Sequence, residues 1–134
     1  MEIVKPGDTA SRTRTISDEM IRTYAELTGD TNPVHLDDGY AAGTRFGRRI
    51  AHGMIAAGLI SATLANDLPG PGTVYLSQSL KFKLPVFPGD TVTATVEVVS
   101  VRPDKPIVTL STVCTNQEGE VVLEGEAAVL VTAV

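Results

Sequence analysis

The sequence predicts an α+β fold in which an antiparallel β-sheet wraps around one long apolar helix. Helical signals precede the turn-forming run 69–72 and strand signals follow it, and the character of the chain changes only there. Segment 52–64 is apolar almost all round, whereas the second half alternates apolar and polar residues in strand-like stretches. A sheet with one apolar face buries that face by packing against such a helix.

Length and composition predict a single globular domain over residues 1–134, since single domains usually hold about 100–200 residues. An apolar fraction of 43% excludes intrinsic disorder. No apolar run reaches the roughly 20 residues of a membrane-spanning helix, so no membrane partner is expected. The net charge of −5 argues against a nucleic-acid partner. No basic patch followed by an apolar stretch marks a leader at the N-terminus, so cytoplasmic residence is expected.

The first predicted helix covers residues 18–28. Ser17 can serve as its N-cap, and Ile16 and Ile21 occupy the two positions of a hydrophobic staple. Gly29 is a natural helix stop. The helix is expected to present one apolar face, made of Met20, Tyr24 and Leu27.

Turn residues and periodicity define the remaining elements. The stretch after Gly29 is predicted to be loop up to Arg49, with a short helix at 37–42, and the central helix follows at 52–64. The single cysteine, Cys114, lies in a strand-like stretch away from histidine and basic residues, which favours a buried structural thiol over a catalytic one. Strands are predicted at 73–84, 91–101, 107–115 and 121–131.

A polar cluster on the loop after the first helix is the first candidate for chemistry. Asp30, Asn32 and His35 lie within six residues, on a loop that Pro33 stiffens. Asp and His are common acid/base side chains, so this loop could move protons in both directions at one water molecule. An ordinary helix-terminating turn is the alternative, and from the spacing alone it is the commoner outcome.

The start of the central helix is the second candidate. Unpaired backbone N–H groups there attract negative charge, and Gly53 lets a ligand oxygen approach the backbone. A plain helix start with a packing glycine is the alternative. The spacing of the two histidines and scattered acids matches no metal-site pattern, so no metal is expected. Ser61 lacks the second glycine of a nucleophile elbow, which disfavours a serine hydrolase.

Three ordered blocks carry a resemblance to a known family. Residues 29–37 (GDTNPVHLD), 46–54 (FGRRIAHGM) and 79–90 (SLKFKLPVFPGD) together resemble the MaoC-like hydratases, in particular the stand-alone (R)-specific enoyl-CoA hydratases that supply polyhydroxyalkanoate synthesis. The resemblance implies the hot dog fold, a long helix wrapped by an antiparallel sheet. It also implies a homodimer joined edge to edge, with the acyl-CoA thioester entering a tunnel near the subunit interface.

The resemblance also implies roles for individual residues. Asp30 and His35 would be the catalytic pair, and Asn32 would brace their loop. The Gly53 N–H would contact the thioester oxygen, and Ser61 would line the site near the water. The implied enzyme is a hydro-lyase that adds water to trans-2-enoyl-CoA and gives (R)-3-hydroxyacyl-CoA, without any metal or organic cofactor.

Substrate contacts are expected from three further residues. Leu64 lies three positions after Ser61 on the central helix and would limit the acyl path, unless it is simply core packing. Arg45 and Lys83 are candidates for contact with the coenzyme A phosphates, and solvated surface charge is the alternative.

Other functions remain open from the sequence. The same site could serve acyl-carrier-protein thioesters or branched or dicarboxylic acyl-CoA esters, because the pocket decides among these substrates. A hot dog thioesterase and a non-catalytic acyl-CoA-binding module are less favoured, since the spacing of Asp30 and His35 fits hydration and both residues are present. A homodimer is also expected because a sheet around one helix leaves an unpaired edge.

Overall fold

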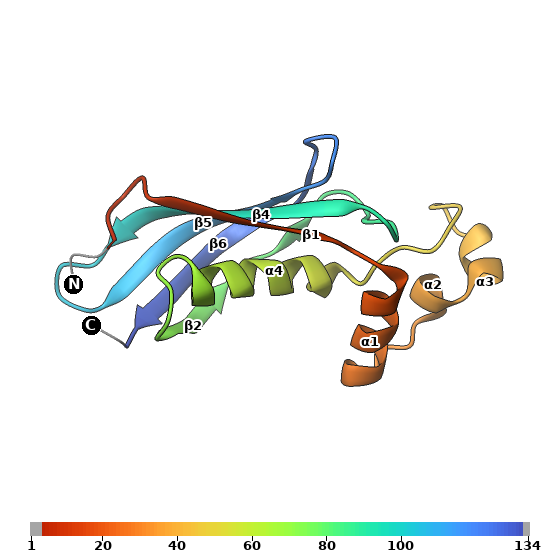
Figure 1. The fold of residues 1–134 in the computed structure, drawn as a ribbon, viewed down its shortest axis with the longest axis horizontal. Helices are drawn as coiled ribbons and strands as arrows, with labels where there is room; N and C mark the ends of the chain where they lie inside the picture. Colours follow the sequence, from red (N-terminus) through yellow and green to blue (C-terminus); the bar gives the residue numbers. More distant parts are fainter. Residues whose placement is uncertain (1–3, 133–134) are drawn as a thin grey trace.

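The computed structural model describes residues 4–132 and confirms the predicted α+β, hot dog arrangement. A six-stranded antiparallel sheet curves along one side of the long helix α4 (Gly53–Asn66), as Figure 1 shows. The strands run in the order β1-β4-β5-β6-β2, and β3 also pairs with β6. They are β1 (Thr9–Thr15), β2 (Thr73–Gln78), β3 (Lys81–Phe82), β4 (Thr91–Val101), β5 (Ile107–Thr115) and β6 (Val121–Val131).

The core lies between α4 and the inner face of the sheet. Ile60 and Leu64 of α4 are at most 1% exposed. Four alternate residues of β4, whose apolar face was predicted, are buried to the same degree: Val92, Ala94, Val96 and Val98. Each buried valine, leucine or isoleucine side chain contributes about 1.5–3 kcal/mol of hydrophobic stabilisation.

The prediction that α4 is enclosed on most sides holds only where the sheet covers it. Met54 on the opposite face is 50% exposed, and Gly58 one turn later is exposed as well. A single curved sheet covers only part of a helix surface, and nothing else within residues 4–132 covers the rest. No helix in this part of the chain is long and apolar enough to cross a membrane.

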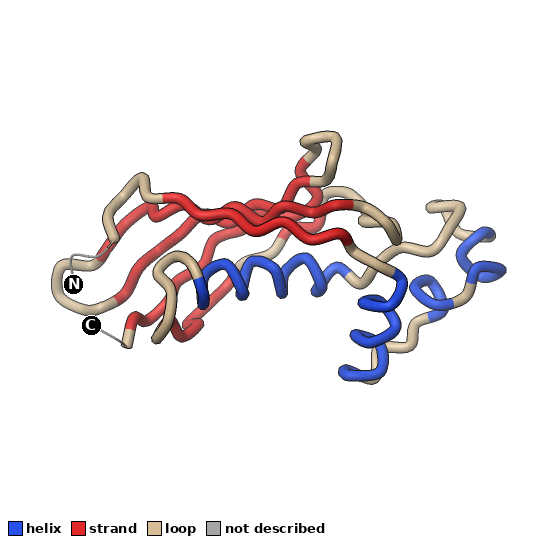
Figure 2. The backbone as a smooth tube through the Cα atoms, in the orientation of Figure 1, coloured by secondary structure: helices blue, strands red, loops and turns tan. Residues whose placement is uncertain are grey.

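Three shorter helices gather at the amino end of α4 (Figure 2): α1 (Asp18–Thr28), α2 (Pro33–Leu36) and α3 (Asp38–Ala42). The predicted ends of α1 are confirmed. The Met20 N–H donates to the Ser17 hydroxyl at 3.1 Å, and Gly29 closes the helix with a φ of +80°. The predicted apolar face is wrong at Leu27, which is 81% exposed because the last turn of α1 projects away from the sheet.

The stretch between α1 and α4 is more helical than predicted. The short helix expected at 37–42 is present as α3, with Asp37 as its N-cap. A further turn of helix, α2, stands where only loop was expected. Asn32 caps α2 by accepting the Val34 N–H at 3.1 Å, and Pro33 suits its first position because proline needs no N–H partner there.

The strands β4, β5 and β6 have the predicted boundaries, but the first half of the sheet differs from expectation. The predicted strand 73–84 is interrupted into β2 and β3, which both pair with β6. The edge strand β1 was not predicted, since Ala10 is its only residue that is even partly buried. Its hydroxyl side chains instead pair across to β4, as in Ser11 with Thr95 at 2.9 Å and Thr13 with Thr93 at 2.8 Å.

Cys114 is the buried structural thiol that the sequence predicted. Its Sγ lies 3.6 Å from the Ala56 carbonyl oxygen, between β5 and α4. Burial raises the pKa of the Cys114 thiol to about 12, so the reactive thiolate form is suppressed.

A glycine on β6 lets the chain cross from β2 to β3. A Cβ at Gly125 would overlap the Ser79 carbonyl oxygen. We expect Gly125→Ala to lower the free energy of unfolding by about 1–3 kcal/mol, because backbone must move. Gly58→Ala is the matched control: its Cβ would meet nothing within 4 Å, and alanine should stabilise the helix by up to about 1 kcal/mol. Urea denaturation of both variants checks this, and equal stabilities would contradict the packing at Gly125.

Candidate active site

A cleft of about 620 Å³ opens at the amino end of α4. Its walls are mostly apolar, with a few polar groups from the loop and helix ends, which is typical of a small-molecule site. The lining residues are His35, Arg45, Phe46, Ile50, Ala51, Gly53, Met54, Phe82, Lys83, Leu84, Pro85 and Val86.

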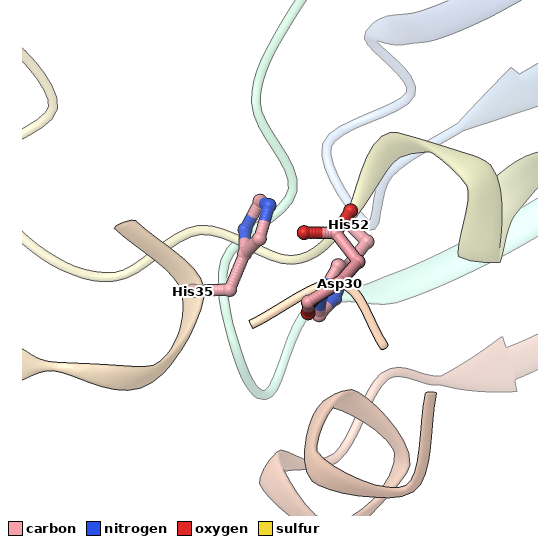
Figure 3. Close-up of side chains that lie close together, drawn as sticks. All are labelled: Asp30, His35 and His52. Atoms are coloured by element: carbon pink, nitrogen blue, oxygen red, sulfur yellow. The ribbon is translucent and has the colours of Figure 1, made fainter. Parts of the chain in front are cut away.

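Beside this cleft the fold brings together Asp30, His35 and His52 (Figure 3). Asp30 follows α1, His35 belongs to α2, and His52 is the N-cap of α4. One side-chain ligand atom from each residue lies within 4.8 Å of the other two. In Figure 3 the Asp30 carboxylate points toward the His35 ring.

The ring of His35 is held in one tautomer. Its Nδ1–H donates to the Ile50 carbonyl oxygen at 2.8 Å, which leaves Nε2 with a free lone pair. Burial lowers the pKa of His35 below its ordinary 6.5, and the neighbouring His52 lowers it further. The Ile50 carbonyl and the Asp30 carboxylate oppose this shift without cancelling it. His35 is therefore neutral near pH 7 and can accept a proton or a hydrogen bond through Nε2.

Backbone hydrogen bonds on both sides hold Asp30. Its N–H donates to the Thr28 hydroxyl at 3.2 Å, and its carbonyl oxygen accepts from His52 Nε2 at 3.0 Å. The carboxylate remains exposed, with the Asn32 N–H at 3.4 Å from Oδ1. The loop thus presents a carboxylate in a fixed direction while its main chain is anchored.

The amino end of α4 supplies hydrogen-bond donors next to this pair. The first N–H groups of a helix have no acceptor within the helix, and His52 provides no side-chain cap. Gly53 leaves space that the Phe82 ring occupies, since a Cβ there would lie 2.6 Å from a ring carbon. An oxyanion near Gly53 would meet unpaired N–H groups and the positive end of the helix dipole.

The grouping of one acid with two histidines also has the composition of a metal site, which the sequence spacing did not predict. Each imidazole uses one nitrogen to donate to a main-chain carbonyl, which leaves one lone pair on its other nitrogen. The rings of His35 and His52 are stacked, with centroids 3.9 Å apart and planes 32° apart. The lone pair left on His52 is at Nδ1, which is buried, whereas His35 lines the cleft and has its free lone pair at Nε2. The arrangement therefore suits proton transfer at His35.

Both predicted substrate-binding cations line the cleft. Arg45 lies on one wall and makes no ion pair with any residue from 4 to 132. Lys83 lies on another wall, with its Nζ 3.4 Å from Glu124. The neighbouring arginines serve other contacts. Arg48 stacks over the Phe87 ring at 3.7 Å.

Arg49 is a structural clamp that the sequence did not reveal. Its side chain is only 14% exposed, and its guanidinium contacts Asp18 at 2.5 Å, Asp38 at 2.7 Å and the His35 carbonyl oxygen at 3.2 Å. It thereby ties α1, α2 and α3 together around the loop that carries Asp30.

The structure does not bring the remaining two predicted residues to the cleft. Leu64 is 1% exposed and belongs to the core between α4 and the sheet, which is the packing alternative. Ser61 lies half-buried on α4, two turns beyond Gly53, and is not on the cleft wall. The apolar wall near the helix start is formed instead by Met54, Phe46 and Phe82.

The chain is similar in sequence and fold to known proteins. The MaoC like domain matches residues 2–121. An (R)-specific enoyl-CoA hydratase of Rhodospirillum rubrum is 54% identical over 132 residues, covering 98% of this chain and 91% of that protein. One of Aeromonas caviae is 53% identical over 109 residues, 81% of each protein.

Solved structures agree with the sequence relatives. The (R)-hydratase of A. caviae involved in PHA biosynthesis has a TM-score of 0.94 and 46% identity, over 98% of this chain and 99% of that one. The family match covers most of the chain, and two relatives are more than half identical to it. On this evidence the chain belongs to the MaoC-like domain family.

Proposed function

We propose that the protein is an (R)-specific enoyl-CoA hydratase, a hydro-lyase that adds water to trans-2-enoyl-CoA and gives (R)-3-hydroxyacyl-CoA. The observation that carries this proposal is the pairing of Asp30 with a neutral His35 beside the uncapped amino end of α4. The names of the R. rubrum and A. caviae relatives support the same reaction. Residues 1–134 act as one catalytic domain in this proposal.

The chemistry requires a base, an acid and a site for negative charge. Asp30 takes one proton from water while His35 Nε2 orients that water by accepting its other hydrogen. The hydroxide oxygen bonds to the β-carbon, and the electrons of the double bond move to the thioester oxygen. The Gly53 N–H stabilises the resulting enolate. Asp30 then returns its proton to the α-carbon on the same face, so that one water molecule has been added.

The other predicted residues have supporting roles in the proposal. Asn32 braces the catalytic loop by capping α2. Arg45 and Lys83 meet the phosphates of coenzyme A at the mouth of the cleft. Ser61 would reach the acyl path only if that path extends along α4, and Leu64 stays in the core.

We also propose a homodimer in the cytoplasm. Strand β2 lies at a sheet edge and exposes Val74, Tyr75 and Leu76, while Met54 is exposed on the uncovered face of α4. An exposed apolar edge strand invites pairing with a second copy, and two-fold symmetry is the commonest arrangement. A second chain would cover both surfaces.

Hydration should depend on both members of the Asp30 and His35 pair. Asp30→Asn and His35→Gln keep side-chain size and should each lower kcat by about 10²–10⁴-fold, because the first removes the proton acceptor and the second removes the imidazole that orients the water. The measurement is the loss of enoyl-thioester absorbance with crotonyl-CoA, followed by chiral analysis of the product. Release of free thiol would indicate a thioesterase. Either variant keeping more than half of the wild-type rate while folded would contradict the assignment.

The pH profile should show a neutral His35. Because burial lowers the pKa of His35 in the folded protein, its neutral form persists as the pH falls through 6.5 and is lost only below that value. The acid limb of kcat/KM should therefore lie below pH 6.5. NMR titration of the two histidines assigns the limb, with His35→Gln identifying the signals. A His35 midpoint at or above 6.5 would contradict the burial effect.

Recognition of coenzyme A should depend on Arg45 and Lys83. Replacing both by Gln should raise KM for crotonyl-CoA by about three- to thirtyfold, since each exposed phosphate contact contributes about 0.3–1 kcal/mol. The KM for a crotonyl-pantetheine ester, which lacks those phosphates, should change little. Lys105→Gln, in the turn between β4 and β5, is the control. Equal effects on both esters would show that these cations are only surface charges.

A further inference from the structure

His52 is a buried polar residue. Neither the sequence pattern nor the proposed reaction assigns it a role. Its side chain is 3% exposed. The ring packs against Tyr24, with centroids 4.6 Å apart, and against His35, with centroids 3.9 Å apart. A phenylalanine would fill such an apolar, ring-lined place without any polar atom to satisfy, so the histidine at this position calls for an explanation.

The only hydrogen bond that the His52 side chain makes within residues 4–132 goes to the catalytic loop. Its Nε2 lies 3.0 Å from the Asp30 carbonyl oxygen, 22 positions earlier in the chain. A carbonyl only accepts, so Nε2 carries the proton and Nδ1 carries a bare lone pair. That Nδ1 is buried and has no hydrogen-bond partner among the described residues. The fold therefore leaves His52 Nδ1 without a hydrogen bond while His52 Nε2–H donates to the Asp30 carbonyl oxygen.

The same side chain leaves the helix start open. His52 is the N-cap of α4, where Ser, Thr, Asp or Asn would normally bond the free N–H groups of the first turn. Its ring turns toward Asp30 and makes no cap. The Ile55 N–H bonds the His52 carbonyl oxygen at 3.1 Å, whereas the N–H groups of Gly53 and Met54 have no hydrogen-bond acceptor within residues 4–132 and remain available for an oxygen in the cleft.

We propose that His52 is a positioning residue for hydration: its Nε2–H fixes the main chain of Asp30, so that the Asp30 carboxylate faces the same water as His35. This inference rests on the proposed hydratase function. The Asp30 N–H is already held by the Thr28 hydroxyl, and His52 holds the carbonyl on the other side of the residue. Without that second anchor the loop can shift, and a displacement of about 1 Å at a reacting group can cost about 100-fold in rate.

Two variants separate the donor from the ring. His52→Phe keeps an aromatic ring between Tyr24 and His35 and removes the donor. His52→Gln keeps an N–H donor and removes the ring. We expect His52→Phe to lower kcat about 10- to 100-fold with KM changed less than about threefold, and with thermal stability at or above wild type. We expect His52→Gln to retain kcat within about threefold of wild type.

The two His52 variants would behave differently if His52 only filled space. A residue that only fills space would tolerate Phe and would lose activity in step with stability. The inference is overturned if His52→Phe retains kcat within about threefold of wild type, or if a folded His52→Gln loses as much kcat as His52→Phe.

An activity-independent measurement separates this inference from the proposed function. In wild-type protein with ¹⁵N-labelled histidine, the nitrogen shifts of His52 report which nitrogen carries the proton. Protonation at Nε2 in a protein that does not hydrate crotonyl-CoA would leave the contact intact and overturn the hydratase proposal. Protonation at Nδ1 alone would overturn the contact itself, whatever the activity.

Discussion

The packing of α4 against the inner face of the sheet is the constraint on which the rest of the structure depends. Buried residues such as Ile60 of α4 and Val96 of β4 fix the helix along the sheet. The amino end of α4 then emerges where α1, α2 and α3 gather, as Figure 1 shows. A helix start carries unpaired N–H groups wherever it lies, so the fold alone determines that these donors face the catalytic loop.

The arginines around the site have two different roles: one holds the fold together and another lines the cleft. Arg49 forms ion pairs with Asp18 and Asp38 and donates to the His35 carbonyl oxygen. These contacts hold the three short helices together at the end of the sheet. Arg45 lies on the cleft wall without an ion pair to any residue from 4 to 132, and the rings of His35, Phe46 and Phe82 line the same cleft. A cleft with mostly apolar walls that also carry Arg45 and Lys83 suits a ligand with an apolar chain and an anionic head.

Local signals in the sequence determined much of the fold. Ser17 and Gly29 act on the backbone within a few residues of themselves, so the two ends of α1 could be predicted. Alternation and turn residues likewise predicted the bounds of β4, β5 and β6. The loop that carries Asp30 and His35 was identified by residue type, and the glycine at the start of α4 by its place at a helix end. These features depend on neighbours in the chain.

Tertiary contacts decided what local signals could not. β1 is a strand because β4 pairs with it, and its own residues bury almost nothing. Leu64 became core, and Leu27 became surface, through the placement of the sheet and of α1. His52 reaches Asp30 across 22 positions. The sequence by itself determined which residue types stand at the site, whereas the tertiary structure decided which of their atoms meet, because hydrogen bonds and packing act over distance in space and not along the chain.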